Sequence, residues 1–270
     1  MKLFLSVTLL IAAALPAFAA DVPPFAWPDG KQAAVSLSWD DARDSQATIG
    51  LPLLDKYGIK GTFFIIPENA EKQPGEWKKA LQNGHEIGNH TLDHPCTGNL
   101  DFAAQKALED YSLEKINDDI TTANKQISAL LGVTPVSFAY PCGNSWVGRG
   151  LDTRSFIPLI AAQFTVGRLW HCEGANNPRI VDLSQVLANE LDGKTFEEVL
   201  PLLEEARRTG KWMVLGGHEI NKSGNQTTWT ATLEKLLPYL NDPKNGFWVA
   251  PVGTVGRYIR DARKVQAARK

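Results

Sequence analysis

Two histidines four residues apart carry the clearest chemical signal in this sequence. His90 and His94 can bring two imidazole nitrogens to one metal ion from a single short segment. An adjacent carboxylate pair, Asp40 and Asp41, ends an earlier strand-like run. Two imidazoles and one carboxylate leave a coordination position open, as catalytic zinc sites do for water. The pattern predicts a metal-dependent hydrolase with Zn²⁺ as its metal, and Co²⁺ or Ni²⁺ could occupy the same ligands.

The two neighbouring carboxylates are expected to have different roles. In the run 33–40, Ser36, Ser38 and Asp40 share one face of a strand. Asp40 then points to the interior side, and Asp41 turns over the rim. One carboxylate can bind the metal while the other accepts a proton from the attacking water. The competing interpretation is a pair of loop residues that caps the following helix.

Length and composition favour one folded domain. The chain has 270 residues, 43% of them hydrophobic, and a formal net charge of −2. That length suffices for a single large α/β domain with a substantial core. The near-neutral charge and the lack of a basic run argue against nucleic acid as a partner.

Residues 1–19 have the pattern of a secretory signal peptide. Lys2 precedes an apolar run over 3–15, and Ala17 and Ala19 fit a cleavage site after Ala19. The run is too short to span a bilayer comfortably, although an uncleaved membrane anchor is the alternative. We therefore expect a secreted or periplasmic protein with a mature chain of residues 20–270 and no stable membrane anchor after cleavage.

The three cysteines are expected to be in an oxidising compartment after export. Cys96, Cys142 and Cys172 allow at most one internal disulfide and leave one free thiol. A disulfide between two active-site loops is one interpretation, and the sequence leaves the pairing open. The alternative is three unpaired cysteines, one of which could be a soft metal ligand.

Strand-like and helix-like segments alternate along the chain. Strands are predicted at 33–39, 62–66, 85–88, 136–140, 164–167, 212–215 and 247–249. Helices are predicted at 48–57, 76–82, 110–131, 155–162, 196–208, 230–240 and 255–263. This alternation is typical of parallel strands with crossover helices, in an open sheet or a barrel. Polar residues cluster just after several strands, where α/β barrels carry their functional groups.

Several of these segments together resemble the polysaccharide deacetylases, which contain a NodB homology domain and form carbohydrate esterase family 4. The matching segments are 38–41, 84–94 and 138–143, with Gly217-His218 similar to a late family motif. The ending 248–251 also resembles the last strand of the family. The resemblance covers about residues 31–260. It implies a single-domain α/β fold, a distorted and incomplete (β/α) barrel of about seven parallel strands.

The resemblance also implies roles for individual residues. The metal ligands would be Asp41, His90 and His94; the general base would be Asp40, the general acid His218, and the oxyanion donor the backbone N–H of Cys142. Substrate contacts are expected from Tyr140, Trp170 and Trp229, with Trp146 as a further rim tryptophan. Ordinary packing is the alternative for each tryptophan. His85 precedes its strand, so we expect it at the opposite end in a structural role.

The chain departs from the family pattern at several positions. Ala42 replaces the usual glycine after the carboxylate pair, and Cys142 replaces a tyrosine. Ala139 replaces the arginine that orients the base, for which Arg168 and Arg179 are the candidate substitutes. The fourth motif, normally with an aspartate and a tryptophan, is not recognisable. Trp170 is the candidate for its tryptophan, and no acid partner for the predicted general acid is evident.

These features predict a secreted, metal-dependent deacetylase that acts on an acetylated carbohydrate. Peptidoglycan, chitin and poly-N-acetylglucosamine are the expected polymers. An O-acetyl esterase on xylan-like polymers and a hydrolase of small amides are alternatives within the same chemistry. A non-catalytic carbohydrate-binding protein is an alternative of another class, favoured by the missing arginine and fourth motif. The retained base, acid and metal ligands argue against it.

Overall fold

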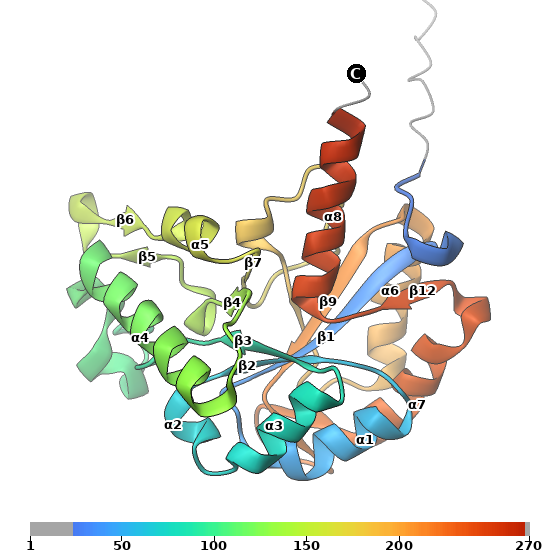
Figure 1. Cartoon of the computed structure of the whole chain (residues 1–270), viewed down its shortest axis with the longest axis horizontal. Coiled ribbons are helices and arrows are strands. Elements are labelled where there is room, and N and C mark those ends of the chain that lie inside the picture. The colour runs from blue at the N-terminus through green and yellow to red at the C-terminus, as the bar shows by residue number, and fades with distance from the viewer. Residues whose placement is uncertain (1–23, 268–270) are drawn as a thin grey trace, which may run out of the picture.

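Parallel strands and helices alternate along the chain as the sequence predicts. The computed structural model describes residues 24–267, and the predicted signal peptide lies outside the described residues. Within that range, no helix is long and apolar enough to cross a membrane. Figure 1 shows one α/β domain in which helices surround a central sheet.

The central sheet has eight strands that all pair in parallel. They are β1 (Ala33–Asp40), β2 (Thr62–Ile65), β3 (Glu86–Asn89), β4 (Ser137–Ala139), β7 (Val166–Arg168), β8 (Asn189–Glu190), β9 (Trp212–Gly217) and β12 (Phe247–Val249). The order is β7-β4-β3-β2-β1-β9-β8, and β12 pairs with the first half of β1. The central position of β1 places the carboxylate pair at its end in the middle of the sheet.

The sheet curls into an incomplete barrel. The N–H of Val186 donates to the carbonyl of Gly167, which belongs to β7 at one end of the strand order. A few residues later, β8 pairs with β9 at the other end. The segment 186–190 therefore contacts both ends of the curled sheet. The predicted distorted barrel of about seven parallel strands is confirmed, and its curvature brings side chains from distant strands towards one interior.

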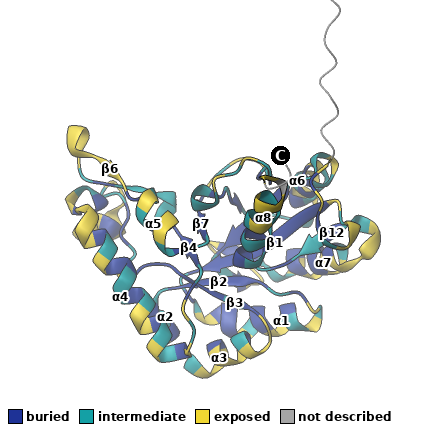
Figure 2. Cartoon of the chain, turned by 45° about the horizontal axis from the view of Figure 1, so that its top comes forward, coloured by how far each residue is buried: buried dark blue, intermediate teal, exposed yellow. Residues whose placement is uncertain are grey.

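Helices lie on both faces of the sheet. The outer face is covered by α1 (Leu51–Lys56), α2 (Pro67–Ala70), α3 (Pro74–Gln82), α4 (Leu113–Leu131), α5 (Ile157–Gln163), α6 (Phe196–Thr209) and α7 (Thr230–Asn241). The last helix, α8 (Val252–Ala267), packs on the inner face, where Val255 shares a buried cluster with Ala34 and Phe64. Figure 2 shows buried strands and helices whose exposed residues face outward. Val35, Leu37 and Trp39 of β1 belong to the core between the sheet and the outer helices. The alternate residues Ser36, Ser38 and Asp40 are thereby left for the barrel interior, as the strand period predicts.

Helix ends follow local sequence signals. Thr195 and Glu198 form a capping box at the start of α6, which ends at Gly210 with a φ of 67°. The predicted helix over 110–131 begins only at Leu113, because the Ser112 side chain caps it and a short 3-10 turn precedes it.

Two small strand pairs, one antiparallel and one parallel, were not predicted. β5 (Trp146–Val147) pairs with β6 (Arg154–Ser155), and β10 (Glu219–Asn221) pairs with β11 (Thr227–Trp229). Strands of two or three residues are too short to show a period in the sequence. The two-residue strand β8 was missed for the same reason.

His85 lies at the start of β3, away from the candidate site. Its buried ring accepts the backbone N–H of Gly61 at Nδ1 (3.1 Å), and Nε2 is 3.2 Å from Asp55 Oδ1. These contacts tie β3 to the turn before β2. They support the expectation that this histidine has a structural role.

Candidate active site

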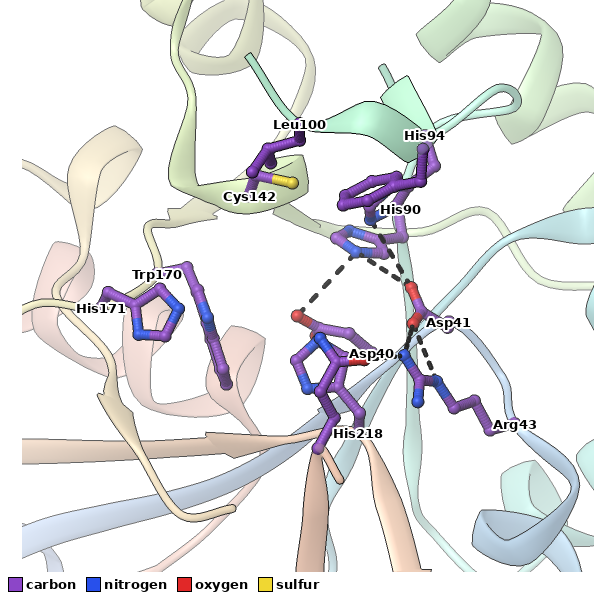
Figure 3. A pocket seen from close by; sticks show the side chains of 12 residues that line it. Asp40, Asp41, Arg43, His90, His94, Leu100, Cys142, Trp170, His171 and His218 are labelled. Atoms are coloured by element: carbon purple, nitrogen blue, oxygen red, sulfur yellow. Dashed lines mark hydrogen bonds and ion pairs between the residues drawn. The ribbon is translucent and has the colours of Figure 1, made fainter. Parts of the chain in front are cut away.

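A cavity of about 570 Å³ opens at the carboxyl ends of the parallel strands. Its lining comes from segments that follow β1, β3, β4, β7 and β9 (Figure 3). The lining residues are Asp40, Asp41, Arg43, His90, His94, Leu100, Phe102, Cys142, Trp170, His171, His218 and Gln226. Most of the predicted chemical groups therefore share one cavity, on the face where α/β barrels place functional residues.

Three of these side chains form a cluster with the ligand types of a metal site. Asp41 Oδ1 is 3.5 Å from His90 Nε2 and 3.6 Å from His94 Nε2. His90 Nδ1 lies 2.9 Å from the carbonyl oxygen of Ala139, to which it donates. That hydrogen bond leaves the Nε2 lone pair directed towards Asp41, which is the usual arrangement of a metal-binding histidine.

The two oxygens of Asp41 have different surroundings. Oδ2 accepts a hydrogen bond from Arg43 Nε at 3.0 Å and forms an ion pair with a terminal guanidinium nitrogen of the same arginine at 2.9 Å. Oδ1 is buried and has no hydrogen-bond partner among the described residues. A buried acceptor without a partner is costly, and a cation held with His90 and His94 would satisfy it. The three residues therefore fit a divalent metal ion.

The cluster has the protonation states that metal binding requires. Burial alone would raise the pKa of Asp41, but the charges of His90, His94, His218 and Arg43 outweigh burial and lower that pKa. Burial, with the charge of His90, lowers the pKa of His94 to about 4, despite the opposing effect of Asp41. At neutral pH the carboxylate is ionised and the His94 imidazole is neutral, so neither must lose a proton to bind metal.

Backbone strain is concentrated around this cavity. Asp41, Ala42, His94 and Cys142 have φ values of 77°, 56°, 51° and 53°. Left-handed conformations at residues other than glycine cluster at functional sites, where the surrounding structure holds them. Ala42 adopts this conformation at the position where the sequence resemblance expects glycine.

Asp40 is held by a buried arginine from another strand. A guanidinium nitrogen of Arg168 donates to Asp40 Oδ1, and both side chains are almost completely buried. Arg168 ends β7 and is the register partner of Ala139 on β4. The arginine expected on β4 is therefore replaced by one on the adjacent strand. Of the two candidate substitutes, Arg168 and not Arg179 contacts the carboxylate.

His218 has an acid partner that the sequence did not reveal. Its Nδ1 is 2.7 Å from Asp192 Oδ2, and its backbone N–H donates to Asp192 Oδ1 at 3.1 Å. The Thr228 hydroxyl also donates to Oδ1, at 2.8 Å. Asp192 follows β8, a strand of two residues that is too short to be recognised in the sequence, so its position near His218 was not predicted. The ring of Trp170 packs against the His218 imidazole in a T-shaped arrangement, with 5.0 Å between the ring centroids.

The surroundings of His218 favour its protonated form. Burial works against the charge, but the hydrogen bond that Nδ1 donates to Asp192 and the charges of Asp40 and Asp41 outweigh burial and raise the pKa of His218. With Nδ1 occupied by Asp192, Nε2 is the nitrogen available to give a proton to a bound molecule.

Comparisons with known proteins agree with this architecture. A family model described as polysaccharide deacetylase matches residues 28–149. A peptidoglycan-N-acetylglucosamine deacetylase from Bacillus cereus is 31% identical over 135 residues, which cover 44% of this chain and 43% of that protein. The predicted resemblance to the polysaccharide deacetylase family is confirmed.

Two further relatives extend the similarity over most of the chain. A gellan lyase from a Bacillus species is 26% identical over 269 residues, covering 90% of this chain but 10% of that protein. The chain thus spans less than half the length of both curated relatives. A family 4 acetyl xylan esterase from Clostridium thermocellum, solved with a cobalt ion, has a TM-score of 0.52 at 21% identity. That alignment covers 81% of this chain and 88% of the esterase chain, and it shows the shared fold.

Two of the residues predicted to contact substrate do not line the cavity. Tyr140 is completely buried and donates its hydroxyl to the carbonyl of Ser184 at 2.8 Å. It packs with Phe138 and Phe156 in the core, because the strand period turns it away from the barrel interior. Trp229 ends β11 and does not line the cavity. Of the three aromatic residues expected to contact substrate, only Trp170 lies at the cavity.

The structure resolves the cysteine pairing that the sequence left open. Cys96 and Cys142 form a disulfide, and Cys172 is free. The disulfide joins the loop after His94 to the turn Pro141–Gly143, whose Cys142 lines the cavity. Because the disulfide occupies both sulfurs, Cys96 and Cys142 cannot bind a metal ion as thiolates. His94 is therefore expected to bind metal with Asp41 and His90.

Removing the disulfide is expected to lower stability by about 2–4 kcal/mol, because it closes a loop between residues separated by 46 positions. The test is urea unfolding of the Cys96→Ala/Cys142→Ala double variant. Cys172→Ala is the matched control and should unfold within about 1 kcal/mol of the unaltered protein. Equal stability of the double variant and the control would show that the disulfide does not stabilise the fold.

Proposed function

We propose that the protein is a metal-dependent hydrolase that removes acetyl groups from an N-acetylated carbohydrate polymer. Peptidoglycan, chitin and poly-N-acetylglucosamine are the candidate substrates. The observation that carries the proposal is the convergence in one cavity of a metal-ligand cluster, a carboxylate fixed by arginine, and a histidine fixed by aspartate. A carbohydrate-binding protein would need none of these pairings.

Asp41, His90 and His94 would hold the metal, and Zn²⁺ suits their nitrogen and oxygen ligands. A bound divalent ion would supply Lewis acidity that activates water and polarises the acetyl carbonyl. The cobalt ion in the acetyl xylan esterase structure supports a divalent metal in this fold.

The residues of the chain then divide the proton transfers. Arg168 occupies Oδ1 of Asp40, so Oδ2 is the oxygen that takes the proton as water attacks the carbonyl carbon. The N–H of Cys142 donates to the oxyanion that forms, an interaction typically worth about 3–4 kcal/mol. The C–N bond breaks as His218 Nε2 donates a proton to the leaving nitrogen. The products are acetate and a free amine.

The relationship of Arg168 to Ala139 bears on the non-catalytic alternative. That alternative drew its support from the missing arginine and the missing fourth motif. Arg168 provides the contact to Asp40, while Asp192 and Trp170 provide an acid and an aromatic ring at His218. The structure therefore supplies the groups whose apparent loss favoured a binding protein.

We also propose that the protein acts outside the cytoplasm. The signal-like segment over residues 1–19 supports export. The Cys96–Cys142 disulfide at the cavity is consistent with an oxidising compartment.

The test is a substrate panel assayed for acetate, free amine and free hydroxyl. N-acetylated polymers should release acetate and amine in equal amounts. Acetate released only from O-acetylated xylan would replace the amidase proposal with the esterase alternative. Absence of acetate from every polymer, from protein loaded with one metal ion per chain, would refute the proposed reaction.

The Asp192→Asn variant is expected to lose activity at lower pH than the unaltered protein. The general acid works in its protonated form, and Asp192 helps to raise the pKa of His218. Without that carboxylate the pKa of His218 falls, so the alkaline limb of the kcat/KM profile moves towards acid pH. The profile should be measured with saturating metal. An alkaline limb at the same pH in both proteins would contradict the assignment of His218 as the acid.

A further inference from the structure

A second hollow lies beside the candidate active site. This groove, called here the hairpin groove, has a volume of about 420 Å³. Its lining residues are Glu109, Trp146, Gly148, Arg149, Gly150 and Thr153. Trp146 belongs to β5, which pairs with β6 in a hairpin next to α5 (Figure 1).

The hairpin groove is on the same face as the active site. Its two walls come from the loop after β3 and the loop after β4. The same two loops contribute His90 and Cys142 to the lining of the active-site cavity. The Cys96–Cys142 disulfide joins these loops, and the N–H of Gly148 donates to the carbonyl of Leu108 at 3.0 Å. The two walls are therefore fixed relative to each other.

The distance between the two hollows is limited by the chain itself. Cys142 lines the active-site cavity and Trp146 lines the hairpin groove. The two residues are four positions apart in the sequence, so their Cα atoms are at most about 14 Å apart. A short extended oligosaccharide can reach from one to the other.

The lining chemistry suits a sugar chain. Trp146 is half-buried and offers an aromatic surface on which the apolar face of a sugar ring can pack. Arg149 is exposed and pairs with Asp110 at 2.8 Å, and it can donate to hydroxyl or carbonyl oxygens. The Glu109 carboxylate accepts from the Thr97 hydroxyl and the Gly98 N–H, whose bonds lower its pKa against the effect of burial. An aromatic surface with a few polar groups is typical of a small-molecule site.

We propose that the hairpin groove is an outer subsite that binds the substrate polymer beyond the sugar whose acetyl group is removed. The inference rests on the proposed function, because it assigns the occupant as the same carbohydrate chain. It predicts that the protein prefers longer oligosaccharides, and that this preference depends on Trp146 and Arg149.

The test compares kcat/KM for a long and a short N-acetylglucosamine oligomer. In the Trp146→Ala variant the long-to-short ratio is expected to fall about tenfold, which corresponds to losing one well-packed aromatic contact. Trp146→Phe should restore most of the ratio. Leu151→Ala is the matched control, because Leu151 is in the same hairpin, is 99% exposed and does not line the groove.

A second variant separates binding from folding. Trp146 also packs against the core around α5, so its removal affects the hairpin. Arg149 and Asp110 are 66% and 64% exposed, and such surface pairs add little stability. Arg149→Ala should therefore fold normally and still lower the long-to-short ratio. An unchanged ratio in both Arg149→Ala and Trp146→Ala, or an unaltered protein without length preference, would overturn the inference.

Failure of the proposed function would be distinguishable from failure of the subsite. If no oligomer releases acetate, calorimetric titration with the long oligomer still tests the groove. Binding that is weakened by Arg149→Ala but not by Leu151→Ala would support a carbohydrate subsite without catalysis. Equal binding by both variants would refute the subsite.

Discussion

Replacing Arg168 by alanine is expected to lower kcat about a hundredfold or more. Arg168 is the residue that fixes Asp40 Oδ1, and misplacing a catalytic group by about 1 Å can cost a hundredfold in rate. The substitution also leaves a nearly buried carboxylate without its partner, which typically destabilises a protein by about 3–5 kcal/mol. Thermal unfolding should accompany the kinetic measurement, so that lost activity in folded protein is separated from lost fold.

A second substitution tests whether the arginine at position 168 on β7 takes the role of the one expected at position 139 on β4. Ala139 and Arg168 are register partners on neighbouring strands, and both are completely buried. In the Arg168→Ala background, Ala139→Arg places a guanidinium one strand away, in space that the first substitution vacates. The double variant should recover much of the lost activity and stability. Ala139→Arg alone should destabilise the fold, because two arginines would then compete for one buried volume. If the double variant is less active and less stable than either single variant, the two positions are not equivalent sites for the arginine that holds Asp40.

The Asp40→Asn variant is expected to lose about 10²- to 10⁴-fold in kcat, because an amide cannot accept the proton from water. The change is nearly isosteric and keeps an oxygen for Arg168. The metal should still bind, since Asp40 is not among the predicted ligands. The measurement is acetate release alongside metal content. Undiminished turnover in folded, metal-loaded protein would show that Asp40 is not the base, whereas loss of the metal would place it among the ligands.

Much of the fold could be predicted because the long strands and helices carry strong periods. The run that became β1 alternates so regularly that the facing of Asp40 and Trp39 followed from it. The helix predicted over 196–208 is α6, whose ends the structure assigns to a capping box and to Gly210. The short strands did not follow, because β8 has only two residues and is defined by pairing with β9.

The same limit explains which site residues the sequence revealed. His90 and His94 are close in sequence, so their spacing, together with the preceding carboxylate pair, suggested a shared ion. Asp192 and His218 are 26 positions apart and meet only because β8 pairs beside β9. Arg168 could be named only as one of two candidates, since strand register decides which arginine reaches Asp40.

The position of Tyr140 was predicted wrongly for a related reason. Tyr140 lies one position after Ala139, and a single step along a strand reverses the side of the sheet to which a side chain points. Its position near the cavity in sequence therefore gave the wrong face. Trp170 was placed correctly because it follows a strand end in the barrel rim.

The most direct test of the central claim joins metal binding to acetate release in one titration. Chelated mature protein, residues 20–270, is titrated with Zn²⁺ while acetate from an N-acetylated polymer is measured, beside the His90→Ala variant. We predict that activity rises to a maximum at one ion per chain and that His90→Ala neither binds the ion tightly nor releases acetate. Acetate release by the metal-free protein, or undiminished release by His90→Ala, would contradict the account.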